Sequence, residues 1–373
     1  MVSPLAVVSC ARLVVKIGSS LLVDPAGEVR RDWLATLVAD IADRKAAGQQ
    51  IIIVSSGAIA LGARRLNLPK GGRASLEDAQ AAAATGQIAL SQCWADLLGQ
   101  HDIIAAQILV TLDDLEDRRR YLNAAATLER LLGLGVIPVI NENDSVATAE
   151  IRFGDNDRLA ARIAQAASAG GIVLLSDVDG LFTADPSRDR DAQLVSVVPK
   201  VDATILAMAG AGSSSGMGSG GMGSKLEAAR IASAAGADLL LVSGLHDHPL
   251  ARIEREECGT LFTADPSGSA RKAWLAGRLT VKGKVYVDGG AVTALTKGAS
   301  LLPAGAKSVD GKFARGDVLD IIGPDGIAIA RGLAEYDSDD ARKIAGKRSN
   351  VLPDILGYAP RAALIHRDHM VLL

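Results

Sequence analysis

The sequence is poor in cysteine, in aromatic residues and in long apolar runs. Its three cysteines, Cys10, Cys93 and Cys258, are too far apart for a Cys-x-x-Cys metal site and odd in number, so we expect reduced thiols in a cytoplasm. Because aromatic residues make up 3% of the chain, the core must consist mainly of Ala, Val, Leu and Ile. No apolar run approaches the roughly 18 residues that span a bilayer, and no basic segment opens the chain, which argues against a membrane anchor and a signal peptide.

Histidine is also scarce, and the five histidines are scattered along the chain. His246 and His248 come closest to a metal-ligand pattern, but they precede Pro249 in an expected loop. No histidine belongs to a recognisable nucleophile–base arrangement, which disfavours histidine-based acid–base or triad chemistry. The pattern G-x-x-x-x-G-K-[ST] does not occur, which excludes the P-loop class of nucleotide-binding proteins.

Charge is distributed unevenly along the 373 residues. The whole chain has a formal net charge of −3, whereas residues 271–373 contain 16 Lys and Arg against 11 Asp and Glu. This mildly basic part permits contact with RNA or another polyanion but does not require it. The length is sufficient for two or three domains of a globular protein.

Up to about residue 262, short apolar runs alternate with longer Ala-rich stretches. The apolar runs predict buried strands at residues 13–17, 51–54, 103–109, 136–140, 172–175 and 239–242. The Ala-rich stretches predict helices at residues 32–47, 76–99, 121–134, 156–168 and 225–236. Continuous apolar strands separated by helices predict an α/β fold, a three-layer αβα sandwich with a mainly parallel sheet, in which ligands bind at the carboxyl ends of the strands.

After residue 277 the pattern changes to short strand-like pieces separated by glycines. Residues 317–322 and 328–330 are examples of such pieces, and the texture predicts a small β-rich barrel. We therefore divide the chain into a first domain over residues 1–262, a linker over residues 263–277 and a second domain over residues 278–373.

Residues 213–225, Ser-Ser-Ser-Gly-Met-Gly-Ser-Gly-Gly-Met-Gly-Ser-Lys, form the most informative segment. Glycines let backbone N–H groups approach a ligand, the following helix start adds a partial positive charge, and Lys225 adds a full one, which together favour phosphate binding. A flexible Gly/Ser linker is the alternative interpretation of this segment. Its G-x-G-x-x-G match at Gly216, Gly218 and Gly221 is weak evidence, because no predicted strand precedes it.

Polar residues directly follow several predicted strands. Lys16 ends the first strand, where an unpaired buried ammonium would be costly, and this indicates a ligand. Residues 55–58, Ser-Ser-Gly-Ala, follow the second strand as a further anion-binding helix start, with a simple N-cap serine as the alternative. The fourth strand runs into residues 141–145, Asn-Glu-Asn-Asp-Ser, and residues 154–157, Gly-Asp-Asn-Asp, open the next helix with more polar groups than capping needs. Two lysines, glycine loops and acidic loops favour phosphoryl transfer, which depends on positioning and charge neutralisation.

Taken together, these motifs resemble the glutamate-phosphorylating members of the amino acid kinase family. The resemblance is carried in order by residues 14–20, 54–60, 138–148, 153–157 and 220–225. Residues 305–317 are similar to the PUA domain that is fused to many of these kinases. The family implies ATP-dependent phosphorylation of the γ-carboxylate of L-glutamate to L-glutamyl 5-phosphate, the first step of proline biosynthesis.

Carried over residue by residue, the resemblance implies three groups of site residues. The catalytic group, in which two lysines contact the ATP phosphates and a carboxylate organises them, comprises Lys16, Asp157 and Lys225. The glutamate-binding group comprises Ser56, Asp144 and Asn156. The ATP-binding group comprises Lys16, Ser176, Asp177, Ser219, Gly220, Gly221, Met222, Gly223, Ser224 and Lys225. Mg²⁺ is expected on the ATP phosphates, with no side-chain ligands, and no general base is expected.

Two alternatives remain open at this point. One is another kinase of the same fold, such as one acting on N-acetylglutamate, in which Asp144 would have no ammonium group to bind. The other is an RNA-binding protein that acts through the PUA domain, which the slight basic excess and the scarcity of aromatic residues in the tail disfavour. The resemblance also suggests a homo-oligomer, a dimer or a tetramer, and proline as a feedback inhibitor at or overlapping the glutamate site.

Overall fold

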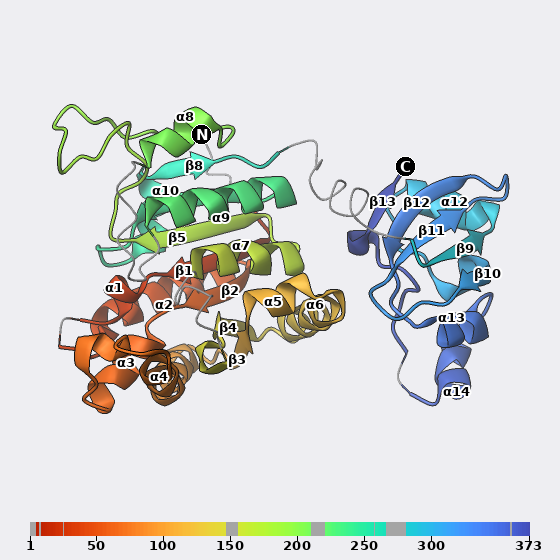
Figure 1. Cartoon of the computed structure of the whole chain (residues 1–373), viewed down its shortest axis with the longest axis horizontal. Helices are drawn as coiled ribbons and strands as arrows, with labels where there is room; N and C mark the ends of the chain where they lie inside the picture. Colours follow the sequence, from red (N-terminus) through yellow and green to blue (C-terminus); the bar gives the residue numbers. More distant parts are fainter. Residues whose placement is uncertain are drawn as a thin grey trace. The chain divides into compact units, whose positions relative to one another are not determined.

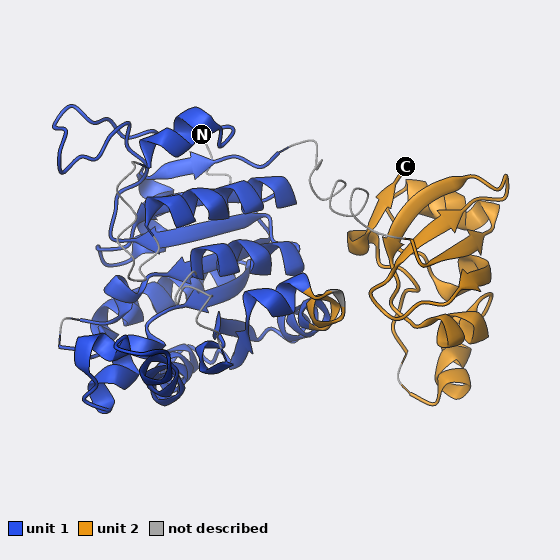
Figure 2. Ribbon diagram, in the orientation of Figure 1, with its two compact units in different colours: residues 1–116, 124–267 blue, residues 117–123, 268–373 orange. Residues whose placement is uncertain are grey.

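The computed structural model describes residues 5–6, 9–24, 26–146, 156–209, 221–256, 258–265, 281–358 and 360–373. Two compact units divide the chain: residues 1–116 and 124–267 form the first, and residues 117–123 and 268–373 form the second (Figure 2). Within the described ranges, no helix has the length and apolar character needed to cross a membrane.

The first unit is built on an eight-stranded sheet with the strand order β3-β4-β2-β1-β5-β7-β8-β6 (Figure 1). Its strands are β1 (Arg12–Ile17), β2 (Gln50–Ser55), β3 (Ala105–Val110), β4 (Ile137–Glu142), β5 (Gly171–Ser176), β6 (Val197–Val198), β7 (Asp238–Ser243) and β8 (Thr260–Phe262). Strands β3, β4, β2, β1, β5 and β7 are parallel to one another. Strand β8 is antiparallel to β7, and β6 is parallel to β8. The predicted mainly parallel sheet is confirmed. Strands β6 and β8 were not predicted, because two or three residues show no periodicity.

Helices pack on both faces of this sheet. The helices of the first unit and of its boundary are α1 (Ser19–Leu22), α2 (Arg31–Ala46), α3 (Ala58–Arg65), α4 (Leu76–Gly99), α5 (Leu112–Glu116), α6 (Arg118–Gly133), α7 (Asn156–Ala166), α8 (Ala203–Met208), α9 (Met222–Ala235) and α10 (Pro249–Arg255). Residues of α2, α4 and α10 share one apolar cluster with Leu13, Val15 and Ile17 of β1. Helices α7 and α9 pack against each other, and α7 also contacts β1 and β5. Because alternate side chains of a strand point to opposite faces, α7 and α9 form the other layer, and the three-layer sandwich is confirmed.

The predicted helices and strands are present, with ends shifted by a few residues. One shift matters for the site. Helix α9 begins at Met222, three residues before the predicted start at residue 225, so Lys225 lies inside its first turn and is not its first residue. Of the predicted loop over residues 213–225, residues 213–220 lie outside the described residues.

The second unit contains a five-stranded sheet with the order β10-β9-β11-β12-β13. Its strands are β9 (Gly283–Val287), β10 (Ala306–Gly311), β11 (Val318–Ile322), β12 (Ala328–Leu333) and β13 (Met370–Leu372), and its helices are α12 (Gly289–Thr296), α13 (Ser338–Ile344) and α14 (Leu352–Leu356). Strands β9 and β11 are parallel and the other neighbours antiparallel. The β-rich character is confirmed, and the helices α13 and α14 pack together beside this sheet as an addition to the prediction.

Helices α3 and α4 cross at two glycines. A Cβ atom on Gly62 would lie 1.7 Å from the carbonyl oxygen of Ala82, and one on Gly86 would lie 1.8 Å from the carbonyl oxygen of Ala58. The two backbones therefore approach to a distance that excludes any side chain. This crossing fixes the amino end of α3, which follows β2 at the carboxyl edge of the sheet.

We expect Gly62→Ala and Gly86→Ala each to destabilise the fold by about 1–3 kcal/mol or more, because the added methyl group forces two backbones apart. Urea denaturation of the full chain measures this. Gly99→Ala is the matched control, since a Cβ at this end of α4 meets no atom within 4 Å. Equal midpoints for Gly86→Ala and Gly99→Ala would contradict the tight crossing.

Candidate active site

Lys16 is the one lysine of β1, and strand alternation places it on the face covered by α7 and α9. There its Nζ lies 2.6 Å from Oδ1 of Asp157, while Nζ of Lys225 lies 3.1 Å from Oδ2 of the same carboxylate. Asp157 is the second residue of α7, and Lys225 belongs to the first turn of α9. The exposed fractions of the three residues are 7%, 1% and 7%. Three separate segments thus meet in one buried ion cluster, made of the three residues that the resemblance implied as the catalytic group.

The cluster contains two ammonium groups that contact the same carboxylate. Burial by itself would raise the pKa of Asp157, but the charges and hydrogen bonds of Lys16 and Lys225 outweigh it and hold the pKa below the usual range. Asp157 is therefore ionised at neutral pH. Two buried ammonium groups beside one carboxylate suit the cluster to an incoming anion.

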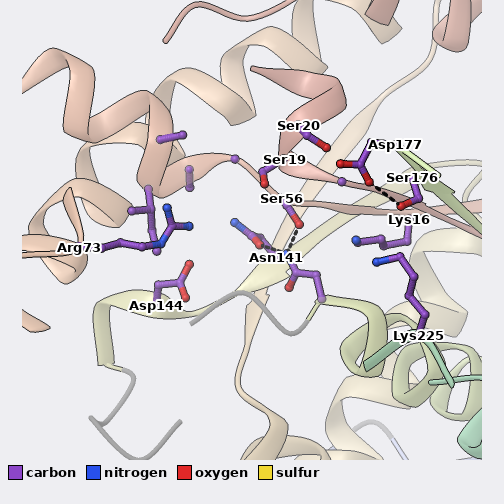
Figure 3. A pocket seen from close by; sticks show the side chains of 16 residues that line it. Lys16, Ser19, Ser20, Ser56, Arg73, Asn141, Asp144, Ser176, Asp177 and Lys225 are labelled. Atoms are coloured by element: carbon purple, nitrogen blue, oxygen red, sulfur yellow. Dashed lines mark hydrogen bonds between the residues drawn. The ribbon is translucent and has the colours of Figure 1, made fainter. Parts of the chain in front are cut away.

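The cluster borders a cavity of about 220 Å³ at the carboxyl edge of the sheet (Figure 3). Its walls come from the ends of β1, β2, β4 and β5, the starts of α3, α7 and α9, and the loop before α4. Figure 3 shows Lys16 and Lys225 at one end of the row of labelled side chains and Arg73 and Asp144 at the other. A single ligand that spans the cavity would therefore meet two ammonium groups at one end and an Arg–Asp pair at the other.

A chain of amide groups forms the middle of the cavity. Nδ2 of Asn141 donates to Oε1 of Gln87 at 2.8 Å, and Nδ2 of Asn156 donates to Oδ1 of Asn141 at 2.9 Å and to Oγ of Ser56 at 2.7 Å. These bonds orient Asn156 so that its buried Oδ1 has no partner among the described residues. Because buried polar atoms are nearly always paired, this oxygen is available to a hydrogen-bond donor of a ligand.

Asp144 lies two residues beyond the end of β4 and is 6% exposed. Burial raises its pKa to about 6, against the opposing effect of the positive charge of Arg73. Within the described chain, its buried Oδ1 accepts no hydrogen bond. A cationic ligand group would supply the missing partner.

The structure describes part of the predicted ATP-binding group. Ser176 ends β5, and its Oγ donates to Oδ1 of Asp177 at 3.1 Å; both residues line the cavity. Gly221 is the N-cap of α9, so the backbone N–H groups of its first turn are directed toward the amino end of this helix. Ser219 and Gly220 lie outside the described residues.

The structure brings most predicted site residues together. The predicted residues that line the cavity are Lys16, Ser56, Asp144, Asn156, Ser176, Asp177 and Lys225. Asp157 lies behind the two lysines, whereas Gly221, Met222, Gly223 and Ser224 start α9 without lining this cavity. The lining residues that were not predicted as site residues include Ser19, Ser20, Arg73 and Asn141. The first two and Asn141 stand inside motifs quoted from the sequence, so their position after a strand was a usable signal; Arg73 lies in a loop and gave none.

The described residues contain no group of three or more His, Cys, Asp or Glu side chains that could hold a metal ion. Both oxygens of Asp157 face lysines.

Comparison with known proteins identifies the family of the chain. The sequence profile described as amino acid kinase family matches residues 11–243, and the PUA domain profile matches residues 283–356. The chain belongs to the amino acid kinase family. The family and the PUA tail expected from the motifs are therefore confirmed.

Three curated members of this family are similar over nearly the full chain. Proteins named glutamate 5-kinase from Zymomonas mobilis and Sphingopyxis alaskensis are each 65% identical over 365 residues, covering 98% of this chain and 92% and 98% of their own lengths. A glutamate 5-kinase from Novosphingobium aromaticivorans is 59% identical over 365 residues, covering 98% of this chain and 97% of its own. These three relatives of the chain all carry the name glutamate 5-kinase.

Asp144→Asn should stabilise the ligand-free kinase at pH 7.5 by on the order of 1–3 kcal/mol. The pKa of Asp144 is about 6 in the folded state, above the usual 3.8 of an aspartate carboxyl group. Between these pH values the unfolded state binds fewer protons than the folded state, so the stability of the wild type falls as the pH rises through this range. Thermal unfolding of both proteins from pH 4 to pH 8 measures the difference. The gain should be present above pH 6 and vanish toward pH 4; a gain independent of pH would show that ionisation of Asp144 is not its cause.

Proposed function

We propose that this chain transfers the γ-phosphoryl group of ATP to the side-chain carboxylate of L-glutamate, giving L-glutamyl 5-phosphate in the first step of proline biosynthesis. Relatives that are 59–65% identical to this chain are named glutamate 5-kinase, which supports this activity. The structural observation that carries it is the buried cluster of Lys16, Asp157 and Lys225, which borders a cavity with an Arg–Asp pair at its far end. We assign the activity to residues 1–262, which contain every residue of that cavity.

The chemistry needs charge neutralisation and no general base. A glutamate side chain has a pKa of about 4.3, so at neutral pH the attacking oxygen is already ionised. The barrier is the repulsion between this carboxylate and the phosphate groups. Lys16 and Lys225 lower it by holding positive charge where negative charge gathers during transfer, and Asp157 keeps both ammonium groups in place. Mg²⁺ bound to ATP would supply further neutralisation.

The substrate roles follow the polarity of the cavity. Ser56 and Asn156 present a hydroxyl group and an amide oxygen to glutamate at the middle of the cavity, and Asp144 presents its carboxylate to the α-ammonium group. Ser176, Asp177 and the amino end of α9 form the nucleotide side. An N-acetylated substrate has no ammonium group and would leave the buried charge of Asp144 without purpose, so we favour free glutamate.

Three accompanying properties belong to the same proposal. We place the enzyme in the cytoplasm, in agreement with three cysteines that form no disulfide. We further propose that proline competes for the glutamate site, since it shares the α-carboxylate and a cationic nitrogen, and that the chain forms a homo-oligomer. The described residues that line the cavity all belong to the first unit.

Formation of ADP in the presence of ATP and Mg²⁺ tests the activity directly. The purified full chain should turn over L-glutamate and should be much less active with N-acetyl-L-glutamate at equal concentration. Trapping the acyl phosphate product with hydroxylamine identifies the site of transfer. A preference for N-acetyl-L-glutamate, or ADP formation that no amino acid stimulates, would contradict the proposal.

Lys16→Ala and Lys225→Ala should each lower kcat by roughly 100-fold or more, the scale of losing one preorganised charge contact. Each variant leaves Asp157 paired with the remaining lysine, so the fold should persist and the thermal midpoint should change little. The matched control is Lys200→Ala, which removes an exposed lysine away from the cavity. Either variant with kcat near that of Lys200→Ala would remove that lysine from the mechanism.

A further inference from the structure

Arg73 lines the far end of the cavity and has no part in the roles assigned above. It follows the 3-10 turn at Pro69–Gly72 and precedes α4, whose N-cap is Ser75. Figure 3 shows its guanidinium group and the carboxylate of Asp144 together at the end of the site away from Lys16 and Lys225. The positive charge of Arg73 acts on Asp144, which agrees with this placement.

Both side chains have unmet hydrogen-bonding capacity inside the site. Nε of Arg73 is buried and makes no hydrogen bond to the described part of the chain, and the same is true of Oδ1 of Asp144. Asp144 is more than nine-tenths buried. Buried donors and acceptors are rarely left unpaired in proteins, so a donor and an acceptor left open at one place indicate a ligand that carries both kinds of group.

We propose that Arg73 binds the α-carboxylate of the amino acid substrate, while Asp144 binds its α-ammonium group, so that together they select a free α-amino acid. The inference rests on the proposed function, because it concerns the non-reacting end of the same substrate. A planar guanidinium group can hold a carboxylate through two parallel hydrogen bonds, which a lysine cannot do.

The polarity of the cavity gives the substrate one orientation. Glutamate carries two carboxylates, and both ends of the cavity offer cations. At the end at Arg73, a carboxylate oxygen of Asp144 has no partner among the described residues and matches the α-ammonium group. At the other end, Asp157 is paired with both lysines and Asp177 accepts a hydrogen bond from Ser176. The zwitterionic end is therefore directed away from Lys16 and Lys225, and the γ-carboxylate is left facing the two lysines. Arg73 is thus a specificity-determining residue that prevents the substrate from binding in reverse.

The backbone N–H groups at the start of α3 are a competing partner for the α-carboxylate, because Gly57 and Ala58 also line the cavity. If they held this group, Arg73 would serve only to offset the charge of Asp144. The two roles differ in one measurable property, which is the discrimination between ligands with and without an α-carboxylate.

The test compares L-glutamate with 4-aminobutyrate, which lacks the α-carboxylate, and with glutarate, which lacks the α-ammonium group. Each compound is measured as a substrate or, where turnover is slow, as a competitive inhibitor against glutamate. Arg73→Gln should lower kcat/KM for glutamate by about 10- to 100-fold, mainly through KM, and leave the constant for 4-aminobutyrate nearly unchanged. Asp144→Asn should instead narrow the preference for glutamate over glutarate.

Two controls separate this role from a structural one. Arg65→Gln removes the same charge from an exposed position on α3 outside the cavity and should behave as the wild type. Arg73→Lys keeps the charge and should recover part of the lost affinity for glutamate.

The outcomes separate this inference from the function on which it rests. Suppose that the wild-type enzyme phosphorylates glutamate. If Arg73→Gln then lowers kcat/KM for glutamate and for 4-aminobutyrate equally, or lowers neither, the assignment of Arg73 is overturned and the proposed function stands. A wild-type chain that neither turns over glutamate nor gains thermal stability from it overturns both proposals.

Discussion

The ion cluster of Lys16, Asp157 and Lys225 is the interaction on which the arrangement of the site depends. It joins the central strand β1 to the amino ends of α7 and α9, which are far apart in the sequence. A carboxylate between two ammonium groups makes both lysines tolerable in a buried place, and the two ammonium groups suit the site to phosphate. One set of contacts therefore serves both the packing of the helical layer and the electrostatics of phosphoryl transfer.

At the other end of the cavity the buried charge is negative. Asp144 is buried, and one of its carboxylate oxygens has no partner among the described residues. Burial raises its pKa to about 6, so the ionised form is disfavoured there, although it predominates at neutral pH. Such a group lowers the stability of the empty protein and is relieved when a cation enters. Ligand-free and ligand-bound states should thus differ in stability by more than the contact area alone implies.

Much of this architecture could be predicted from the residues. The central strands are continuous apolar runs, and Lys16 stood out because a charge at the end of such a run needs a partner. The pairing of Lys16 with Asp157 could not be derived, because it joins segments whose spacing in space depends on the sheet order. Arg73 was missed for another reason: it lies in a loop without periodicity, where an arginine is ordinary. The crossing of α3 and α4 was also hidden, since single glycines in Ala-rich helices give no local signal.

The contact of Gly62 with the backbone of α4, and of Gly86 with that of α3, joins these two helices into one mechanical body. Ser56 lies directly before the amino end of α3, and Gln87 of α4 accepts a hydrogen bond from Asn141. The loop that contains Arg73 connects α3 to α4. A change of substrate preference during evolution is therefore constrained. The shared helix faces have no room for larger side chains, so new specificity would have to arise in the length and composition of the connecting loop.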